Sequence, residues 1–389
     1  MHSSLIITIL IVFLALAFDF INGFHDTATA VATSITTKAL TPKQAIIICC
    51  ICNFIGAFMG TAVAKTVGDN IVSHTSIPQW VIMCVLISSI IWNLLTWYFG
   101  IPSSSSHALI GALIGGGIAY TMTFDVVNWY NLFHSVILWL ILSPLIGFIV
   151  GYILMLILNC ILKSHKRSVV NKLFLKLQVL AGAFMALNHG GNDAQKSMGI
   201  ITMALLSGGL ISSFEVPVWV IFLCALSMAL GTSIGGKKII KTMGSGRGND
   251  AQKSMGIITM ALLSGGLISS FEVPVWVIFL CALSMALGTS IGGKKIIKTM
   301  GSGMAKLTPV NGFAAQTGAA FVILCATLFH APVSTTHIIT TSIMGVGASK
   351  RIKNVKWGVA KQIVWAWVLT IPITAVFSGV IILIVKLFI

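Results

Sequence analysis

Two aspartates in a mostly apolar chain are the first candidates for chemistry. The chain has only eight acidic residues among 389, and Asp26 and Asp193 each follow an apolar run, a glycine and a polar residue. A charge within a membrane-spanning helix costs roughly 3 kcal/mol or more, so a charge kept there usually marks an ion or substrate path. Helix capping is the structural alternative for either aspartate alone. Their matching contexts favour a binding role for both.

Two hydroxyl-rich segments that follow a proline are the second candidate. Pro102 precedes four serines and His107, and Pro332 precedes Val-Ser-Thr-Thr and His337. Proline suits a helix start, and a helix start offers free N–H groups and a positive dipole to an oxyanion. Ordinary capping and packing is the alternative for one segment, but not for a matched pair. The residues predicted to bind the substrate are Ser104, Ser105, Ser106, Ser334, Thr335, Thr336, Asn22, Asn192 and Gln195.

Other polar residues in apolar runs are given structural roles. His107 and His337 occupy matching places, and we interpret both as packed structural histidines, with a proton relay as the minor alternative. Asn53 and Gln316 lie within predicted spans, where a hydrogen bond between helices is at least as good an explanation as ligand contact. Lys196 is expected at the membrane interface, with its ammonium group extended toward water.

The composition excludes a set of soluble domains. Hydrophobic residues make up 57% of the chain and charged residues 8%, whereas a soluble domain has about 25% charged residues. The positive net charge comes from short Lys and Arg clusters between apolar runs, which is typical of cytoplasmic loops and does not indicate nucleic acid. The eight cysteines show no zinc or disulfide spacing. No nucleophile and base are arranged as in a hydrolase, so an enzyme is not expected.

The apolar runs predict an all-α polytopic membrane protein, because about 20 apolar residues cross a bilayer. Shorter runs rich in Gly, Ser and Thr lie between the long ones and are predicted to be half-helices of broken spans. The spans are predicted at 4–20, 45–64, 79–99, 134–162, 173–190, 216–235, 273–292, 311–330 and 357–387, and the half-helices at 26–37, 103–119, 194–210, 251–267 and 334–349.

The charge pattern predicts two inverted repeats. Basic clusters such as 163–176 and 350–356 are assigned to the cytoplasm. The N-terminal half then runs from outside to inside and the C-terminal half runs back, with both termini outside the cell membrane. This is the inverted-topology design of many secondary transporters, with broken helices meeting near the membrane midplane. We divide the chain into an N-terminal repeat at 1–162, a cytoplasmic basic loop at 163–172 and a C-terminal repeat at 173–389.

An exact internal duplication interrupts the second repeat. Residues 191–246 recur without change as 248–303. Removing one copy makes the spacing from Asp193 to the second proline motif close to that from Asp26 to the first. We therefore interpret the extra copy as an insertion into a two-fold design. Only the first copy follows the apolar run that ends in His189, so the working site is assigned to Asp193 and not to Asp250.

Four ordered motifs give the chain a family resemblance. Residues 18–33, 92–107, 188–196 and 332–337 resemble the signatures of the inorganic phosphate transporter (PiT) family, compact bacterial type. The resemblance implies uptake of inorganic phosphate in symport with sodium ions or protons, at a central site between the repeats. It places the paired aspartates of the family at Asp26 and Asp193. These would bind sodium, or accept hydrogen bonds from the hydroxyl groups of phosphate.

The expected partners are inorganic phosphate and membrane lipid, with no nucleic acid and no cofactor beyond the coupling ion. A homodimer is the assembly that the resemblance implies. Alternating access about the pseudo-two-fold axis is the expected mechanism. Two alternatives stay open, namely a sulfate permease of the same superfamily and a passive anion channel.

Overall fold

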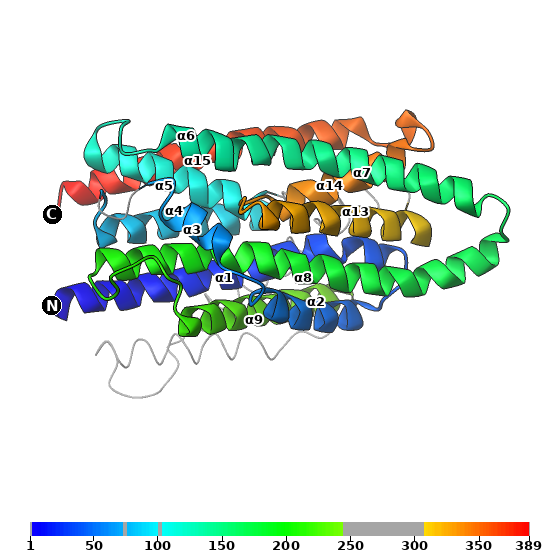
Figure 1. The fold of residues 1–389 in the computed structure, drawn as a ribbon, viewed down its shortest axis with the longest axis horizontal. Helices are drawn as coiled ribbons and strands as arrows, with labels where there is room; N and C mark the ends of the chain where they lie inside the picture. Colours follow the sequence, from blue (N-terminus) through cyan, green and yellow to red (C-terminus); the bar gives the residue numbers. More distant parts are fainter. Residues whose placement is uncertain (1, 73–75, 100–102, 244–306, 389) are drawn as a thin grey trace, which may run out of the picture.

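Long helices that run along one axis form the molecule (Figure 1). A computed structural model describes residues 2–72, 76–99, 103–243 and 307–388. In the described part the regular structure is helical, apart from one isolated bridge between Val72 and Val127. In chain order the elements are α1 (His2–Thr36), α2 (Pro42–Gly56), α3 (Ala62–Gly68), α4 (Gln79–Phe99), α5 (Ser105–Thr121), α6 (Trp129–Asn131), η1 (Leu132–Ile137), α7 (Leu138–Leu162), α8 (Arg167–Ser207), α9 (Val218–Met243), α13 (Pro309–Leu328), α14 (Thr335–Ala348), η3 (Ile352–Asn354) and α15 (Trp357–Lys386).

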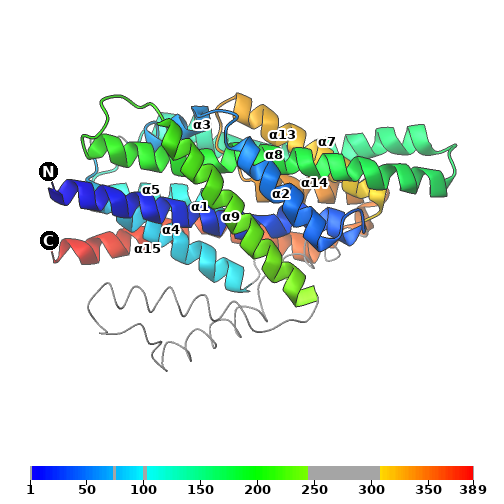
Figure 2. The ribbon, with the colours of Figure 1, turned by 90° about the horizontal axis from the view of Figure 1, so that it is seen from below.

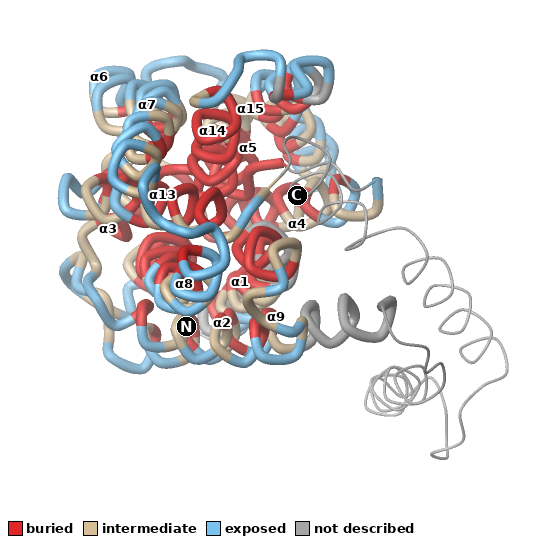
Figure 3. The backbone as a smooth tube through the Cα atoms, turned by 90° about the vertical axis from the view of Figure 1, so that its right-hand side faces the viewer, coloured by how far each residue is buried: buried red, intermediate tan, exposed pale blue. Residues whose placement is uncertain are grey.

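The distribution of side chains fits an integral membrane protein. Buried residues gather along the middle of the bundle, and exposed residues cover outer helices such as α7 and α15 (Figure 3). Many of the exposed side chains are large and apolar, as at Ile149 and Val376, whereas the carboxylates of Asp19, Asp26 and Asp193 are buried. Lipid is the solvent that such a surface requires. Six of the described helical segments are long and apolar enough to cross a bilayer, namely Ile6–Gly23, Gln79–Phe99, Trp129–Leu162, Arg167–Ser207, Pro309–Leu328 and Ile363–Lys386.

The first and eighth helices are continuous, which corrects the half-helices predicted at 26–37 and 194–210. Both runs extend the preceding apolar helix without a break, within α1 and α8. The glycines near these predicted breaks, Gly23 and Gly190, allow close helix contact. A Cβ atom on Gly23 would lie 2.3 Å from the Met228 carbonyl oxygen of α9, and one on Gly190 would lie 2.3 Å from that of Asn53 in α2. The basic loop predicted at 163–172 is also shorter, because α8 already begins at Arg167.

The span predicted at 45–64 is wrong, since two shorter helices replace it. Thr41 caps α2 in a reciprocal capping box with Gln44, and α2 ends at Gly56. The chain then turns, and α3 packs against α8, where a Cβ atom on Gly68 would lie 2.3 Å from the Gly199 carbonyl oxygen. The predictions for 251–267, 273–292 and the second copy at 248–303 lie outside the described residues.

Two short helices begin inside the bundle, at the hydroxyl-rich segments. The Ser104 hydroxyl caps α5 and the Ser334 hydroxyl caps α14, each by accepting a hydrogen bond from the backbone N–H three residues later. Both helices start where the sequence predicts, and both starts are buried. The fold therefore brings two helix N-termini into the interior of the protein.

The helices of the two halves pack on one another in a reciprocal pattern. Helix α5 packs on α15, while α14 packs on α7; α1 packs on α9, while α8 packs on α2 and α3. Figure 2 shows α2 and α9 side by side, both tilted relative to α1 and α8. Small residues permit the matching contacts, since a Cβ atom on Gly115 or on Gly345 would lie 2.0 Å from a carbonyl oxygen of the facing helix. Each half thus supplies the support for the helix start of the other.

Candidate functional site

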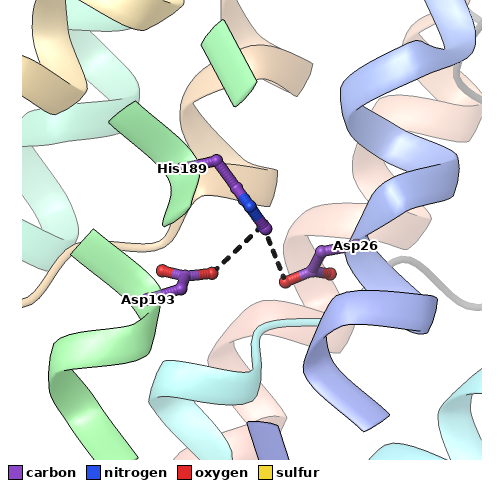
Figure 4. A group of neighbouring side chains, drawn as sticks. All are labelled: Asp26, His189 and Asp193. Atoms are coloured by element: carbon purple, nitrogen blue, oxygen red, sulfur yellow. Dashed lines mark ion pairs between the residues drawn. The ribbon is translucent and has the colours of Figure 1, made fainter. Parts of the chain in front are cut away.

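Two aspartates and a histidine meet between α1 and α8 (Figure 4). His189 Nε2 lies 3.3 Å from Asp193 Oδ2 and 3.9 Å from Asp26 Oδ2. Its other ring nitrogen, Nδ1, lies 3.1 Å from Asn53 Oδ1 on α2, which orients the ring. All three side chains are buried, with Asp26 only 2% and Asp193 only 1% exposed. Two carboxylates are therefore held in the interior on either side of one imidazole.

Hydroxyl groups from the two buried helix starts reach this cluster. Thr336 Oγ1 of α14 donates to Asp26 Oδ1 at 3.1 Å, and Thr335 Oγ1 donates to Asp193 Oδ2 at 3.3 Å. From α5, Ser105 donates to the side-chain oxygen of Asn22 at 2.9 Å. Asn22 in turn donates to Asp193 Oδ2 at 3.4 Å. The structure thus joins residues that lie up to 310 positions apart in the sequence.

A buried lysine completes the cluster. Lys196 lies one helical turn after Asp193 and forms an ion pair with Asp193 Oδ1. Its ammonium group also donates to Ser106 Oγ and, at 3.0 Å, to the Val333 carbonyl oxygen. The side chain is 1% exposed. The expected interfacial position of Lys196 is therefore wrong, because the lysine shares the inner face of α8 with Asp193.

The remaining predicted residues support the cluster without joining it. Ser104 and Ser334 accept hydrogen bonds from the N–H groups of His107 and His337 as helix caps. Asn192 donates to Ala331 O at 3.2 Å and accepts from Val333 N, and so holds the segment before α14. Gln195 accepts from Val63 N at 2.8 Å and fixes the start of α3. These four residues position the helix starts around the carboxylates.

Three residues at or near the cluster were not predicted from the sequence. His189 and Lys196 lie four residues before and three residues after Asp193, which places them on its face of a continuous helix. Asp19 is fully buried on α1 and accepts a hydrogen bond from Ser197 Oγ at 2.7 Å. An acidic residue inside the first apolar run was the available signal for Asp19. His107 and His337, which we interpret as structural histidines, are buried and pack against each other with ring centroids 4.5 Å apart.

The set of groups suits two kinds of ligand at once. Hydroxyl groups, a helix N-terminus and an ammonium group are donors for an oxyanion. Carboxylates and hydroxyl oxygens are the ligands of hard cations. Within the described part of the chain, ligand atoms of Asp26, His189 and Asp193 lie within 4.8 Å of one another and form the group that could hold a metal ion. The site can therefore bring an anion and a cation together in the interior.

Comparisons with known proteins agree with this chemistry. The sequence model of the phosphate transporter family matches residues 22–248 and 245–378. The chain is 44% identical over 382 residues to a "Probable low-affinity inorganic phosphate transporter" of Bacillus subtilis (strain 168), covering 98% of this chain and 97% of the relative. A protein of Rhizobium meliloti (strain 1021) with the same name is 38% identical over 366 residues, which is 94% of this chain and 92% of the relative.

A solved structure supports the fold. The chain is similar to a protein described as "The sodium-dependent phosphate transporter", with a TM-score of 0.74 at 20% identity. The match covers 98% of this chain and 100% of that chain. The helical arrangement described above is therefore one that a solved membrane transporter also has.

Proposed function

Because the chain belongs to the phosphate transporter family, we propose that it carries inorganic phosphate across the cell membrane by secondary active transport, in symport with sodium ions or protons. The observation that carries this proposal is the convergence of two buried helix starts on Asp26 and Asp193. The hydroxyl groups at those starts turn toward the carboxylates in the structure. They are the donors that an entering oxyanion would engage.

Phosphate suits this site better than sulfate does. Near neutral pH phosphate carries at least one hydroxyl group, so it can donate to a carboxylate while it accepts from Ser105, Ser106 or Thr335. Sulfate has no hydrogen to donate and would leave Asp26 or Asp193 facing an oxygen without a partner. An unpaired buried carboxylate is costly, so the aspartates select against sulfate.

Charge balance calls for a cation beside the anion. Two buried carboxylates and a phosphate repel one another in a medium of low dielectric constant. Lys196 offsets one of these charges, and sodium ions or protons bound at the cluster of Asp26 and Asp193 would remove the remaining repulsion. Substrate and coupling ion would then bind together, which couples their movement. The sodium dependence named for the structural relative is one precedent for such coupling.

Alternating access would follow from two inverted repeats, at 1–162 and 173–389. The reciprocal packing of α5 on α15 and of α14 on α7 supports such a relation. Both termini lie at one end of the bundle, and the basic loop between α7 and α8 lies at the other (Figure 1). By the positive-inside rule the basic end faces the cytoplasm and the termini face outside. Rocking of one half against the other would expose the central site to each side in turn.

Substrate choice can be tested with the purified protein in liposomes. Uptake of labelled phosphate should proceed in the presence of a tenfold excess of sulfate, while unlabelled phosphate competes fully. Equal competition by sulfate would favour the sulfate permease. Uptake that stops at equal concentrations on the two sides, under an imposed sodium or proton gradient, would favour the passive channel.

A further inference from the structure

We propose that Lys196 is a built-in cation, which fills the place beside Asp193 where a free monovalent cation would otherwise bind. The inference rests on the proposed function and concerns the cation requirement of that same site. Its consequence is that one side of the site needs no sodium ion. Removal of the ammonium group should open that place and make the protein respond to sodium.

The contacts of the ammonium group resemble those of a coordinated cation. Lys196 Nζ has three oxygen partners, which are the Asp193 carboxylate, the Ser106 hydroxyl and the Val333 carbonyl. They come from three separate parts of the chain, on α8, at the start of α5 and just before α14. A lysine has three hydrogens to donate, so all three are used. A carboxylate, a hydroxyl and the carbonyl of an unwound segment are also the groups that hold coupling ions in transporters.

In the other half of the site, the hydroxyl at the matching sequence position contacts its aspartate directly. Thr336 and Ser106 occupy the same position in their hydroxyl-rich segments, four residues after the proline. Thr336 donates directly to Asp26 at 3.1 Å. Ser106 instead donates to the Val333 carbonyl at 3.0 Å and receives a hydrogen bond from Lys196, which bridges it to Asp193. The ammonium group therefore lies between the Ser106 hydroxyl and the Asp193 carboxylate. On the Asp26 side the corresponding hydroxyl and carboxylate are in direct contact.

The sequence explains why this lysine stands beside Asp193. The third residue after Asp193 is Lys196, whereas the third residue after Asp26 is Thr29. Lys196 is 1% exposed, and its charge is matched by that of Asp193. Loss of the ammonium group would remove the lysine ion pair of a buried carboxylate. A small cation drawn to the same oxygens is the simplest way to restore the balance.

The direct test replaces Lys196 by alanine and varies the cation. The duplication supplies a matched control, because Lys253 stands in an identical local sequence in the second copy. Purified wild type, Lys196→Ala and Lys253→Ala are compared in sodium chloride and in choline chloride. The first measurement is the thermal unfolding midpoint, which does not depend on transport. The second is phosphate uptake into liposomes at equal ionic strength.

We expect Lys196→Ala to show a sodium-specific rise in unfolding midpoint well beyond that of wild type. Lys253→Ala should respond to sodium as wild type does. Lys196→Met, which fills the volume without the charge, provides a second variant where alanine prevents folding.

An unchanged sodium response in both Lys196 variants would overturn the inference. So would an equal gain of sodium response in Lys253→Ala. Failure of the proposed function looks different, since wild type would then take up no phosphate in any salt. The unfolding measurement would still report whether sodium occupies the place of the ammonium group.

Discussion

Asp26 and Asp193 follow similar sequence contexts in α1 and α8, and Lys196 places an ammonium group beside Asp193. On the Asp26 side the carboxylate receives a hydroxyl directly, from Thr336. On the Asp193 side the corresponding hydroxyl is reached through Lys196. The comparison shows that Asp26 and Asp193 lie in one buried cluster but have different neighbours. One side chain, Lys196, therefore makes the surroundings of Asp193 different from those of Asp26.

The largest expected effect is that of Asp193→Asn. The change removes the partner of a buried ammonium group, so we expect uptake to be lost and the free energy of unfolding to fall by about 3 kcal/mol. Thermal unfolding and liposome uptake measure the two effects. Asp250→Asn makes the same change in the second copy and should leave both near wild type. If Asp250→Asn abolished uptake and Asp193→Asn did not, the assignment of the site to the first copy would be wrong.

A smaller effect on stability is expected for Asp26→Asn, because Asp193 forms the ion pair with the buried Lys196. Uptake should fall at least about tenfold, since a coupling-ion or phosphate contact is lost, while the unfolding midpoint stays close to that of wild type. The asparagine keeps an acceptor for the Thr336 hydroxyl. Destabilisation as large as that of Asp193→Asn would remove the contrast between the two sides.

The paired aspartates and the hydroxyl-rich helix starts could be predicted from the sequence, because their residue types repeat in matching contexts. His189 and Lys196 could not be assigned once a break was predicted near Gly190, since their shared face exists only on a continuous helix. Gly190 does not distinguish a helix break from a continuous helix, because glycine is suitable both at a break and at a close helix contact. The close approach of the Asn53 carbonyl oxygen on α2 shows that Gly190 lies at a helix contact, and the local sequence does not indicate this approach.

Gln195 shows a second limit. It follows Asp193 by two positions, so on a helix it points away from the aspartate, and the periodicity alone excludes it from the cluster. Its side chain accepts from the backbone N–H of Val63 in α3 and donates to the backbone carbonyl of Gly191. The sequence did not predict α3 as a separate helix, because the apolar run continues through the turn before it. Residues that hold one helix against another can therefore be identified only when the packing of the helices is known.

Single hydroxyl groups should have moderate effects. Thr336→Val and Ser105→Ala each remove one donor near the carboxylates, and one hydrogen bond contributes about 1 kcal/mol. We expect the KM for phosphate to rise about fivefold to tenfold, with little change in folding. Initial uptake rates over a range of phosphate concentrations measure this. Ser349→Ala is a control away from the cluster, because its hydroxyl bonds only to Val346 O.

The smallest effect on transport is expected for Gln195→Leu. The loss of the hydrogen bond to Val63 N should lower the unfolding free energy by about 1 kcal/mol, because a buried N–H group is left without a partner. The KM for phosphate should stay the same, since Gln195 supports α3 and not the substrate. A large rise in KM with normal stability would instead place Gln195 among the binding residues.

The central claim is that this chain accumulates phosphate through a site that needs Asp26. The most direct measurement is the final internal phosphate concentration in liposomes under an imposed sodium or proton gradient. For wild type it should exceed the external concentration under at least one of the two gradients, and for Asp26→Asn it should not. Accumulation by Asp26→Asn equal to that of wild type, or no accumulation by wild type under either gradient, would contradict the account.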